Sequence, residues 1–410
     1  MSRFTKLAAA ATVAVLVMAA CSSDGDGDDG EATTDTGGSS APSTTTTEVG
    51  PSTPIVLNGQ GNNLLAYATD GSGDSQVLFT NKEDDPENGR DLNAQICFFP
   101  DDPRQFIAGE DTNQPDPLQG WGIFQLEGEA VGDLAATQVG KLTPTYQGSG
   151  DNAENYGCGF LSDGRILTSD VGNQANGEGD GQLIVWFPPF TGGEYVDGAD
   201  NAGFGDVAFC KVDIAIATAG GLYVDDEDNV YLGSARPPTG GVLRYSGDWP
   251  TGPDAAGGCG RTDGTGAPLS DEGAVTREVF IASGEHELLS PHSVAAAPEG
   301  GFYVSSVITG IINEYDADGA FVRTVLRPPA GEAVGPEPIS TGTPLGIGVD
   351  ADGTLYYADI GIVADPENGF GPGENEGTVR SITFVDGEPQ APETLDEGLA
   401  FPDGIGIFQP

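Results

Sequence analysis

Two residues combine chemical reactivity with a position at the start of a predicted strand. Asp403 lies in Pro402-Asp403-Gly404-Ile405, and His292 lies in Pro291-His292-Ser293. A carboxylate binds metals or accepts protons, and an imidazole does both near neutral pH. We therefore predict a catalytic role for Asp403 and His292, with Asp403 also as a metal ligand. For His292 the alternative is an imidazole whose hydrogen bonds are satisfied inside the core.

Three further carboxylates end predicted strands and are candidate metal ligands: Glu110, Asp170 and Asp359. Carboxylates gathered around one opening repel each other unless a cation sits among them. Ca²⁺ takes about six to eight oxygen ligands, so we expect a divalent cation, Ca²⁺ above others, as cofactor. The alternative is that each Asp at a strand end binds neighbouring backbone N–H groups.

Three residues are predicted to bind substrate: Arg236, Trp121 and Tyr156. A guanidinium can hold a carboxylate, and an indole can stack on a sugar. The alternatives are a local ion pair for Arg236 and a buried hydrophobic side chain for Trp121. The sequence has no GxSxG motif and no phosphate-binding loop with Lys-Ser/Thr, which argues against serine hydrolases and nucleotide-binding enzymes.

An internal repeat positions these residues. Each copy has a small-residue apolar strand, a tight acidic or glycine turn and a second strand that ends in a polar residue. Four copies are clear and one is degenerate; they cover 344–359, 291–306, 219–234, 156–170 and 95–110. Further β-rich runs follow each copy, so a unit holds about four strands, as does a propeller blade.

The sixth copy is split between the two ends of the domain. Residues 401–407 match the first strand of a unit, and the rest of that unit begins near residue 60. We predict an all-β, six-bladed β-propeller over residues 55–410, with 405–407 beside 64–68. The C-terminal strand would then complete the first blade and remove exposed sheet edges. The predicted blades are 401–410 with 60–88, 91–145, 155–212, 218–282, 290–330 and 343–390.

Long loops are expected on one face of this propeller. They follow the second strands and cover 110–121, 170–181, 234–241 and 359–377. The same face holds the starts of the first strands, including Tyr156, His292 and Asp403. Binding sites are commonly built on loops carried by a rigid scaffold. We call this face the mouth and expect the functional site there.

Residues 1–20 have the features of a lipoprotein signal peptide. Arg3 and Lys6 precede a short apolar run that ends in Ala19-Ala20-Cys21. We predict lipidation of Cys21, and an ordinary secretory signal is the alternative. Residues 21–54 are rich in Ser, Thr, Asp and Gly and are predicted to form a disordered linker. The protein is therefore expected on the extracytoplasmic face of the cell membrane, with the lipid as its only membrane contact.

Four other cysteines are predicted to form two disulfides: Cys97, Cys158, Cys210 and Cys259. An even number in an exported domain favours disulfides over a zinc site. Three connectivities are possible, and we favour the pairs Cys97–Cys158 and Cys210–Cys259.

The charge excludes some partners. The chain has 64 acidic and 15 basic residues, for a net charge of −49. Such a charge repels phosphate backbones and anionic lipids, so nucleic-acid binding is not expected. The 64 glycines and 29 prolines also exclude a helical bundle.

The blade sequences resemble those of a known superfamily. Pro402-Asp403-Gly404-Ile405 and residues 349–359, VDADGTLYYAD, are similar to blade signatures of gluconolactonase and senescence-marker-protein-like propellers, which overlap with NHL-type repeats. The resemblance extends over most of 60–410. It implies a six-bladed propeller and metal-dependent hydrolysis of a lactone or related ester, with Asp403 as metal ligand or base. The superfamily's metal-binding Glu and Asn lack clear counterparts, unless Glu110 replaces the Glu.

Two functions follow from these patterns. The first is a surface-tethered, divalent-metal-dependent hydrolase of a lactone or related ester. The second is a non-catalytic propeller that binds a small molecule, such as a sugar or lactone, or a surface protein. Propellers serve both purposes, so the fold does not decide between them. A monomer is expected in either case.

Overall fold

A computed structural model describes most of the domain after residue 52. The described residues are 53–70, 74–85, 89–110, 120–142, 155–170, 181–190, 207–213, 216, 219–234, 240–252, 275–328, 342–365, 369–373 and 375–409. None of these segments is helical, and none therefore contains a helix able to cross a membrane. The predicted signal peptide, Cys21 and most of the linker lie outside them and stay predictions.

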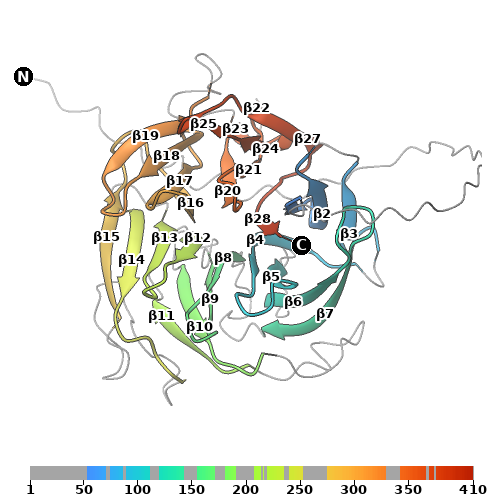
Figure 1. The fold of residues 1–410 in the computed structure, drawn as a ribbon, viewed down its shortest axis with the longest axis horizontal. Helices are drawn as coiled ribbons and strands as arrows, with labels where there is room; N and C mark the ends of the chain where they lie inside the picture. The colour runs from blue at the N-terminus through green and yellow to red at the C-terminus, as the bar shows by residue number, and fades with distance from the viewer. Residues whose placement is uncertain are drawn as a thin grey trace, which may run out of the picture.

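The chain forms a six-bladed β-propeller of four-stranded antiparallel sheets, as predicted (Figure 1). In blades 1 to 3 the strands, from the axis outward, are β28 (Ile405–Phe408), β1 (Ile55–Gln60), β2 (Asn63–Ala68) and β3 (Gln76–Phe79); β4 (Leu92–Phe98), β5 (Gln105–Glu110), β6 (Gly120–Glu127) and β7 (Ala135–Leu142); β8 (Asn155–Phe160), β9 (Ile166–Asp170), β10 (Gln182–Trp186) and β11 (Phe209–Asp213).

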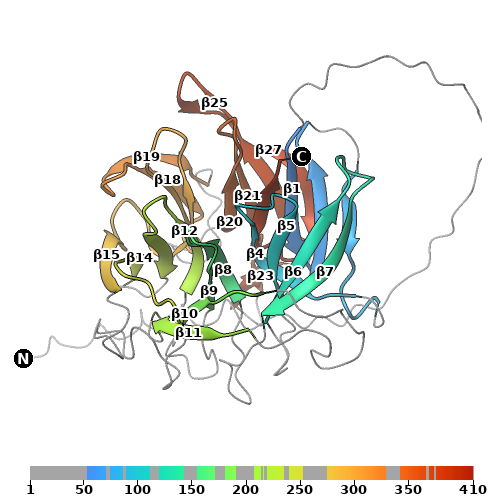
Figure 2. The ribbon, with the colours of Figure 1, turned by 60° about the horizontal axis from the view of Figure 1, so that its bottom comes forward.

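Blades 4 to 6 repeat this order. Their strands are β12 (Ala219–Val224), β13 (Val230–Ser234), β14 (Gly241–Ser246) and β15 (Thr276–Ala282); β16 (Pro291–Ala296), β17 (Phe302–Ser306), β18 (Ile311–Tyr315) and β19 (Phe321–Leu326); β20 (Pro344–Val349), β21 (Leu355–Asp359), β24 (Gly377–Ile382) and β27 (Glu393–Leu399). Blade 6 also carries two hairpins, β22 (Ile362–Asp365) with β23 (Gly369–Pro372) and β25 (Phe384–Val385) with β26 (Glu388–Pro389). The β25 hairpin projects from the ring in Figure 2.

The C-terminal strand closes the ring, but its neighbour differs from the predicted one. β28 pairs with β1, with Ile55 opposite Phe408, and β2 lies one strand further out. The predicted pairing with 64–68 was wrong because residues 55–60 form a strand of their own directly after the predicted linker. Blade 6 likewise extends beyond residue 390, to β27.

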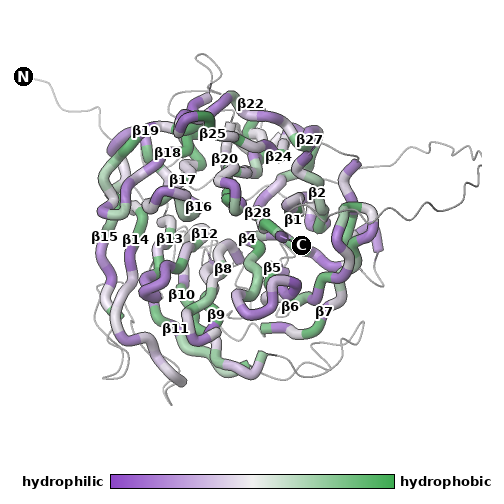
Figure 3. Tube along the Cα trace, viewed as in Figure 1, coloured by the Kyte–Doolittle hydropathy of each residue, from purple (hydrophilic) through white to green (hydrophobic). Residues whose placement is uncertain are grey.

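Six hydrophobic clusters fill the spaces between neighbouring blades. For example, Phe106 and Phe408 belong to the cluster between blades 1 and 2, and Leu183 and Leu243 to the one between blades 3 and 4. Hydrophobic segments accordingly recur in every blade around the ring (Figure 3). Neighbouring blades cover both faces of each sheet, so second strands such as β13 and β21 are buried along their whole length.

Glycines allow the inner strands to approach each other near the axis. A Cβ at Gly220 would lie 2.4 Å from the carbonyl oxygen of His292 in the next blade. At Gly404 the corresponding distance to the carbonyl oxygen of Ala94 would be 1.5 Å. Both are far below normal van der Waals contact, so these two positions require glycine.

One predicted disulfide is confirmed. Cys97 on β4 and Cys158 on β8 are bonded, with their Cα atoms 6.0 Å apart, and they join the inner strands of blades 2 and 3. Cys210 is also disulfide-bonded. Cys259 lies outside the described residues, so the pair Cys210–Cys259 stays a prediction.

Candidate functional site

The inner strands share an irregularity where they begin. The register between first and second strand shifts near the starts of β4, β8, β12, β16 and β20. Tyr156, His292 and Leu345 lie within these shifts. A bulge redirects side chains and is frequent beside functional sites. The aligned repeat therefore marks a real structural feature around the axis.

The second strands end where the repeat predicts, which defines the rim of the mouth. β5 ends at Glu110, β9 at Asp170 and β21 at Asp359. Asp170 lies opposite Asn155 and Asp359 lies opposite Pro344, so strand ends and strand starts share one face.

His292 is held by the neighbouring blade. Its Nδ1 lies 3.1 Å from the carbonyl oxygen of Leu345 and 3.2 Å from Ser293 Oγ. A carbonyl only accepts, so we assign the proton to Nδ1, which leaves a lone pair on Nε2. Nε2 is buried and has no hydrogen-bond partner among the described residues. Burial lowers the pKa of His292 to about 4, although the hydrogen bond to Leu345 opposes this shift.

An apolar group of side chains surrounds the axis at the mouth. Tyr156, from blade 3, packs edge to face on His292 of blade 5, with ring centroids 4.8 Å apart. On the inner strand of blade 4, Gly220 packs on the backbone of His292. We call the following buried residues the axis cluster: Tyr156, Val307, Leu345, Ile360 and Ile362. It is the one described cluster that draws on blades 3, 5 and 6 together.

Asp403 lies just before the innermost strand β28 and hydrogen-bonds to the backbone of two neighbouring strands. Its Oδ2 accepts the N–H of Ala94 at 3.0 Å, and its own N–H donates to the carbonyl of Gly59 at 2.9 Å. The side chain is 2% exposed. Asp403 therefore ties the C-terminal strand to the start of blade 2, a role that the sequence analysis did not foresee.

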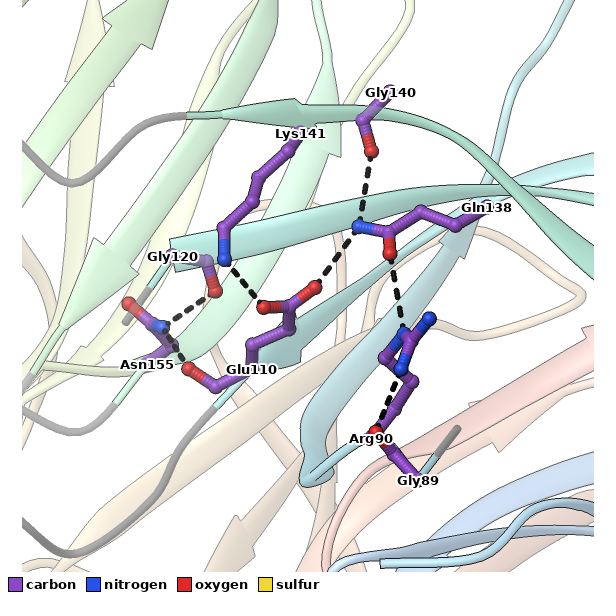
Figure 4. A network of polar contacts seen from close by, with 8 residues as sticks. All are labelled: Gly89, Arg90, Glu110, Gly120, Gln138, Gly140, Lys141 and Asn155. Atoms are coloured by element: carbon purple, nitrogen blue, oxygen red, sulfur yellow. Dashed lines mark hydrogen bonds and ion pairs between the residues drawn. The ribbon is translucent and has the colours of Figure 1, made fainter. Parts of the chain in front are cut away.

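Glu110 belongs to a buried ion-pair network (Figure 4). Its carboxylate accepts from Lys141 Nζ at 2.6 Å and from Gln138 Nε2 at 3.0 Å. Gln138 also accepts from Arg90 Nε at 3.3 Å, and Asn155 Nδ2 donates to the carbonyl of Glu110. Burial alone would raise the pKa of Glu110, but Lys141 more than offsets this and the pKa is lowered.

The other two rim carboxylates, Asp359 and Asp170, are also buried at the ends of their strands. Asp359 Oδ1 accepts the N–H groups of Thr343 at 2.8 Å and Gly361 at 3.0 Å, which is the backbone-binding alternative considered above. Burial raises the pKa of Asp359 against the effect of these hydrogen bonds. Asp170 is 1% exposed at the end of β9.

The described residues do not fit a metal cage. Glu110, Asp170 and Asp359 lie on blades 2, 3 and 6, and Asp403 precedes β28. Within the described ranges, no group of three or more His, Cys, Asp or Glu side chains is placed to hold a metal ion. The expected crowding of carboxylates is thus not found in this part of the chain.

The predicted substrate-binding residues have separate outcomes. Trp121 is fully buried in the core between blades 2 and 3, so its ring offers no face to a sugar and the stacking role is corrected to the buried alternative. Tyr156 does lie at the axis. Arg236 lies outside the described residues.

The side chain of Gln95 makes contacts that the sequence analysis did not predict. Its side chain runs from β4 to β12, two blades away, where it bonds to both the N–H and the carbonyl of Leu222 at 3.0 Å. Its Oε1 also accepts the N–H of Cys158 at 3.2 Å. All three partners are backbone atoms, which leave no sequence signal. Gln95 thus connects three blades across the axis.

Comparison with known proteins gives distant likenesses only. No protein-family model and no curated protein matches the chain. Among solved structures, a luciferin-regenerating enzyme has a TM-score of 0.48 at 14% identity, over 86% of this chain and 97% of that one. A protein of unknown function from Bacteroides caccae has 0.47 at 12%, over 88% and 100%. A protein from Bacteroides uniformis, provisionally named a 6-phosphogluconolactonase, has 0.45 at 11%, over 87% and 99%.

Proposed function

We propose that the protein is a propeller hydrolase of a lactone or related ester, with His292 as the general base. The observation that carries this proposal is the buried Nε2 of His292, which has no hydrogen-bond partner among the described residues. The hydrogen bond between Nδ1 and Leu345 and the lowered pKa of His292 favour an unprotonated Nε2. A buried polar atom without a partner costs free energy, of the order of 1–3 kcal/mol. Such a cost is expected where a ligand supplies the missing partner.

The proposed reaction uses this lone pair. Nε2 takes a proton from a water molecule as the water oxygen attacks the ester carbonyl. The tetrahedral intermediate then expels the alkoxide, which receives the proton from Nε2 as the acyl–oxygen bond breaks. The carbonyl of Leu345 keeps a proton on Nδ1, so that Nε2 is the basic nitrogen before the attack and the acid that returns the proton to the alkoxide. General base catalysis of this kind contributes roughly 10²–10⁴-fold in rate.

No step of this proposal uses a metal. The described carboxylates do not fit a cage, and Asp403 and Glu110 are already engaged by Ala94 and Lys141. The Ca²⁺ cofactor, the lipid anchor at Cys21 and the extracytoplasmic location stay proposals that rest on the sequence.

A non-catalytic propeller is the second candidate. It is favoured by the structural engagement of Asp403 and Glu110, two residues that the hydrolase prediction had assigned to a metal. In this case the mouth would bind a small molecule or a surface protein without chemistry, and the unpaired Nε2 of His292 would accept a hydrogen bond from that ligand.

The two histidines allow a matched test of the proposal. We expect His292→Gln to lower kcat for lactone hydrolysis at least about 100-fold, as loss of a general base predicts. His286→Gln is the control, since His286 is exposed and stacks on Phe321 away from the axis cluster. Equal activity of His292→Gln and wild type would overturn the hydrolase proposal. Ligand binding without turnover in the wild type would favour the second candidate.

A further inference from the structure

We infer that Ser305 is a positioning residue for His292: its hydroxyl holds the carbonyl of Leu345 where this oxygen accepts from Nδ1, and so decides which imidazole nitrogen carries the proton. This inference rests on the proposed function, because a general base needs its lone pair on Nε2. It adds to that proposal a residue on β17 that the sequence analysis did not single out.

Ser305 lies opposite an irregularity in β16. The pairing of β16 with β17 places two residues, His292 and Ser293, opposite the single residue Ser305. This is a β-bulge, which redirects side chains and locally disrupts the ladder of backbone hydrogen bonds. The N–H of Ser293 donates to Ser305 Oγ at 3.0 Å. Ser305 is fully buried, so its hydroxyl is engaged by groups of the protein rather than by bulk water.

The same hydroxyl reaches the next blade. Ser305 Oγ donates to the carbonyl oxygen of Leu345 at 3.2 Å, and His292 Nδ1 lies 3.1 Å from this oxygen. A carbonyl oxygen has two lone pairs and can accept both bonds. Because Ser305 Oγ already accepts the N–H of Ser293, its one proton is available for Leu345. The carbonyl of Leu345 is thus held as an acceptor that faces Nδ1.

A second neighbour of Nδ1 makes the tautomer depend on this carbonyl. Ser293 Oγ lies 3.2 Å from Nδ1 and, as a hydroxyl, can either accept from it or donate to it. If Ser293 donates, Nδ1 holds the lone pair and Nε2 holds the proton. The lone pairs of Nδ1 and of the Leu345 oxygen would then face each other across 3.1 Å, which is repulsive. Ser305 prevents the carbonyl from turning away and so keeps the proton on Nδ1.

The propeller does not require a hydroxyl at this place. In blades 4 and 6 the residues opposite the corresponding irregularity are Gly233 and Ala358. Neither side chain can donate a hydrogen bond, and both blades keep four paired strands. The hydroxyl of Ser305 is therefore better explained by its effect on His292 than by a need of the fold.

Ser169 in blade 3 supplies a matched control. Its Oγ donates to the carbonyl of Gly220 in the next blade at 2.7 Å, the same kind of contact that Ser305 makes with Leu345. The imidazole of His292 makes its hydrogen bonds elsewhere. Loss of the Ser169 hydroxyl should therefore leave the imidazole unchanged.

Nitrogen NMR of the full chain, labelled in its two histidines, measures the tautomer directly. His292→Gln assigns the signals, and His286 is an internal reference. At pH 7 the wild type should show a protonated Nδ1 and a lone pair on Nε2 at position 292. Ser305→Ala should lower the ratio of this tautomer to the other about tenfold, as loss of one hydrogen bond predicts, and move the two signals toward each other. Ser169→Ala should give the wild-type spectrum.

Two further variants separate the tautomer from folding. Ser305→Cys keeps the shape of the side chain with a far weaker donor, so it should give the same change if Ser305→Ala does not fold. Adding Ser293→Ala to Ser305→Ala removes the hydroxyl that donates to Nδ1 in the second tautomer. The signal of a protonated Nδ1 should then return.

Three outcomes would overturn the inference: a wild type with the proton on Nε2, an unchanged spectrum of Ser305→Ala, or an equal change in Ser169→Ala. None of them depends on ester cleavage. With a lactone that the wild type hydrolyses, Ser305→Ala should also lower kcat about tenfold and leave KM unchanged. Failure of the hydrolase proposal would instead give the expected spectra without turnover of δ-valerolactone or gluconolactone.

Discussion

The imidazole of His292 in blade 5 and the backbone carbonyl of Leu345 in blade 6 are joined by a hydrogen bond of 3.1 Å. The bond links two inner strands at the point where both have a register shift. It orients the ring and favours the tautomer with a proton on Nδ1, which leaves Nε2 as the basic nitrogen. A single contact between blades 5 and 6 thus holds the imidazole at the mouth.

Protonation of His292 should make stability depend on pH. Its pKa is about 4 in the folded protein and about 6.5 when unfolded, so the unfolded state binds more protons between these values. Stability from this group is complete above pH 6.5 and is lost as pH falls, by about 3 kcal/mol at pH 4. Urea unfolding of wild type and His292→Gln at pH 7 and pH 4 measures this. A stability difference between the two proteins that does not change with pH would contradict the low pKa.

The Glu110–Lys141 pair should be strongly coupled. Both residues are at most 8% exposed, so Lys141→Met leaves a buried carboxylate without its cation. We expect a loss of about 3–5 kcal/mol in the free energy of unfolding. Adding Glu110→Gln should recover part of this loss, because the unpaired charge disappears. Additive losses in a double-mutant cycle would show that the pair is not coupled.

Ring closure should be essential to folding. Deletion of 401–410 removes β28 with the buried residues Ile405 and Phe408 and exposes the edge of β1. We expect loss of cooperative thermal unfolding and a tendency to aggregate, because an open sheet edge pairs with other chains. Deletion of 22–50, predicted to lie in the linker, should leave the melting temperature unchanged. A cooperative melt of the 401–410 deletion at the wild-type temperature would contradict this role.

The calcium proposal makes a prediction of its own. A cation bound only by the folded state stabilises it by about 2.7 kcal/mol at a hundredfold excess over Kd, so EDTA should lower the melting temperature if calcium is bound as the sequence predicts. In that case Asp403→Asn should remove this effect and still fold, since an amide oxygen can accept the N–H of Ala94 as the carboxylate does. Identical melting of the wild type in EDTA and in excess Ca²⁺ would exclude a stabilising calcium site.

The fold could be predicted from the sequence more fully than the site. The repeat located the ends of second strands at Asp170 and Asp359, because turn residues and apolar alternation are local signals. It missed β1, whose partner β28 is about 350 residues away in the chain. The partner of Asp403 was missed for the same reason: Ala94 is 309 residues from Asp403, and only the closed ring brings them together.

The pH dependence of kcat/KM for lactone hydrolysis tests the central claim most directly. If His292 is the general base, kcat/KM of the wild type rises with pH to a plateau, with a single acidic limb centred on a pKa of about 4. His292→Gln should lose this limb together with at least about 100-fold of the plateau rate, while His286→Gln keeps both. A limb near pH 6.5, or a His292→Gln profile that matches the wild type, would contradict the assignment of His292 as the base.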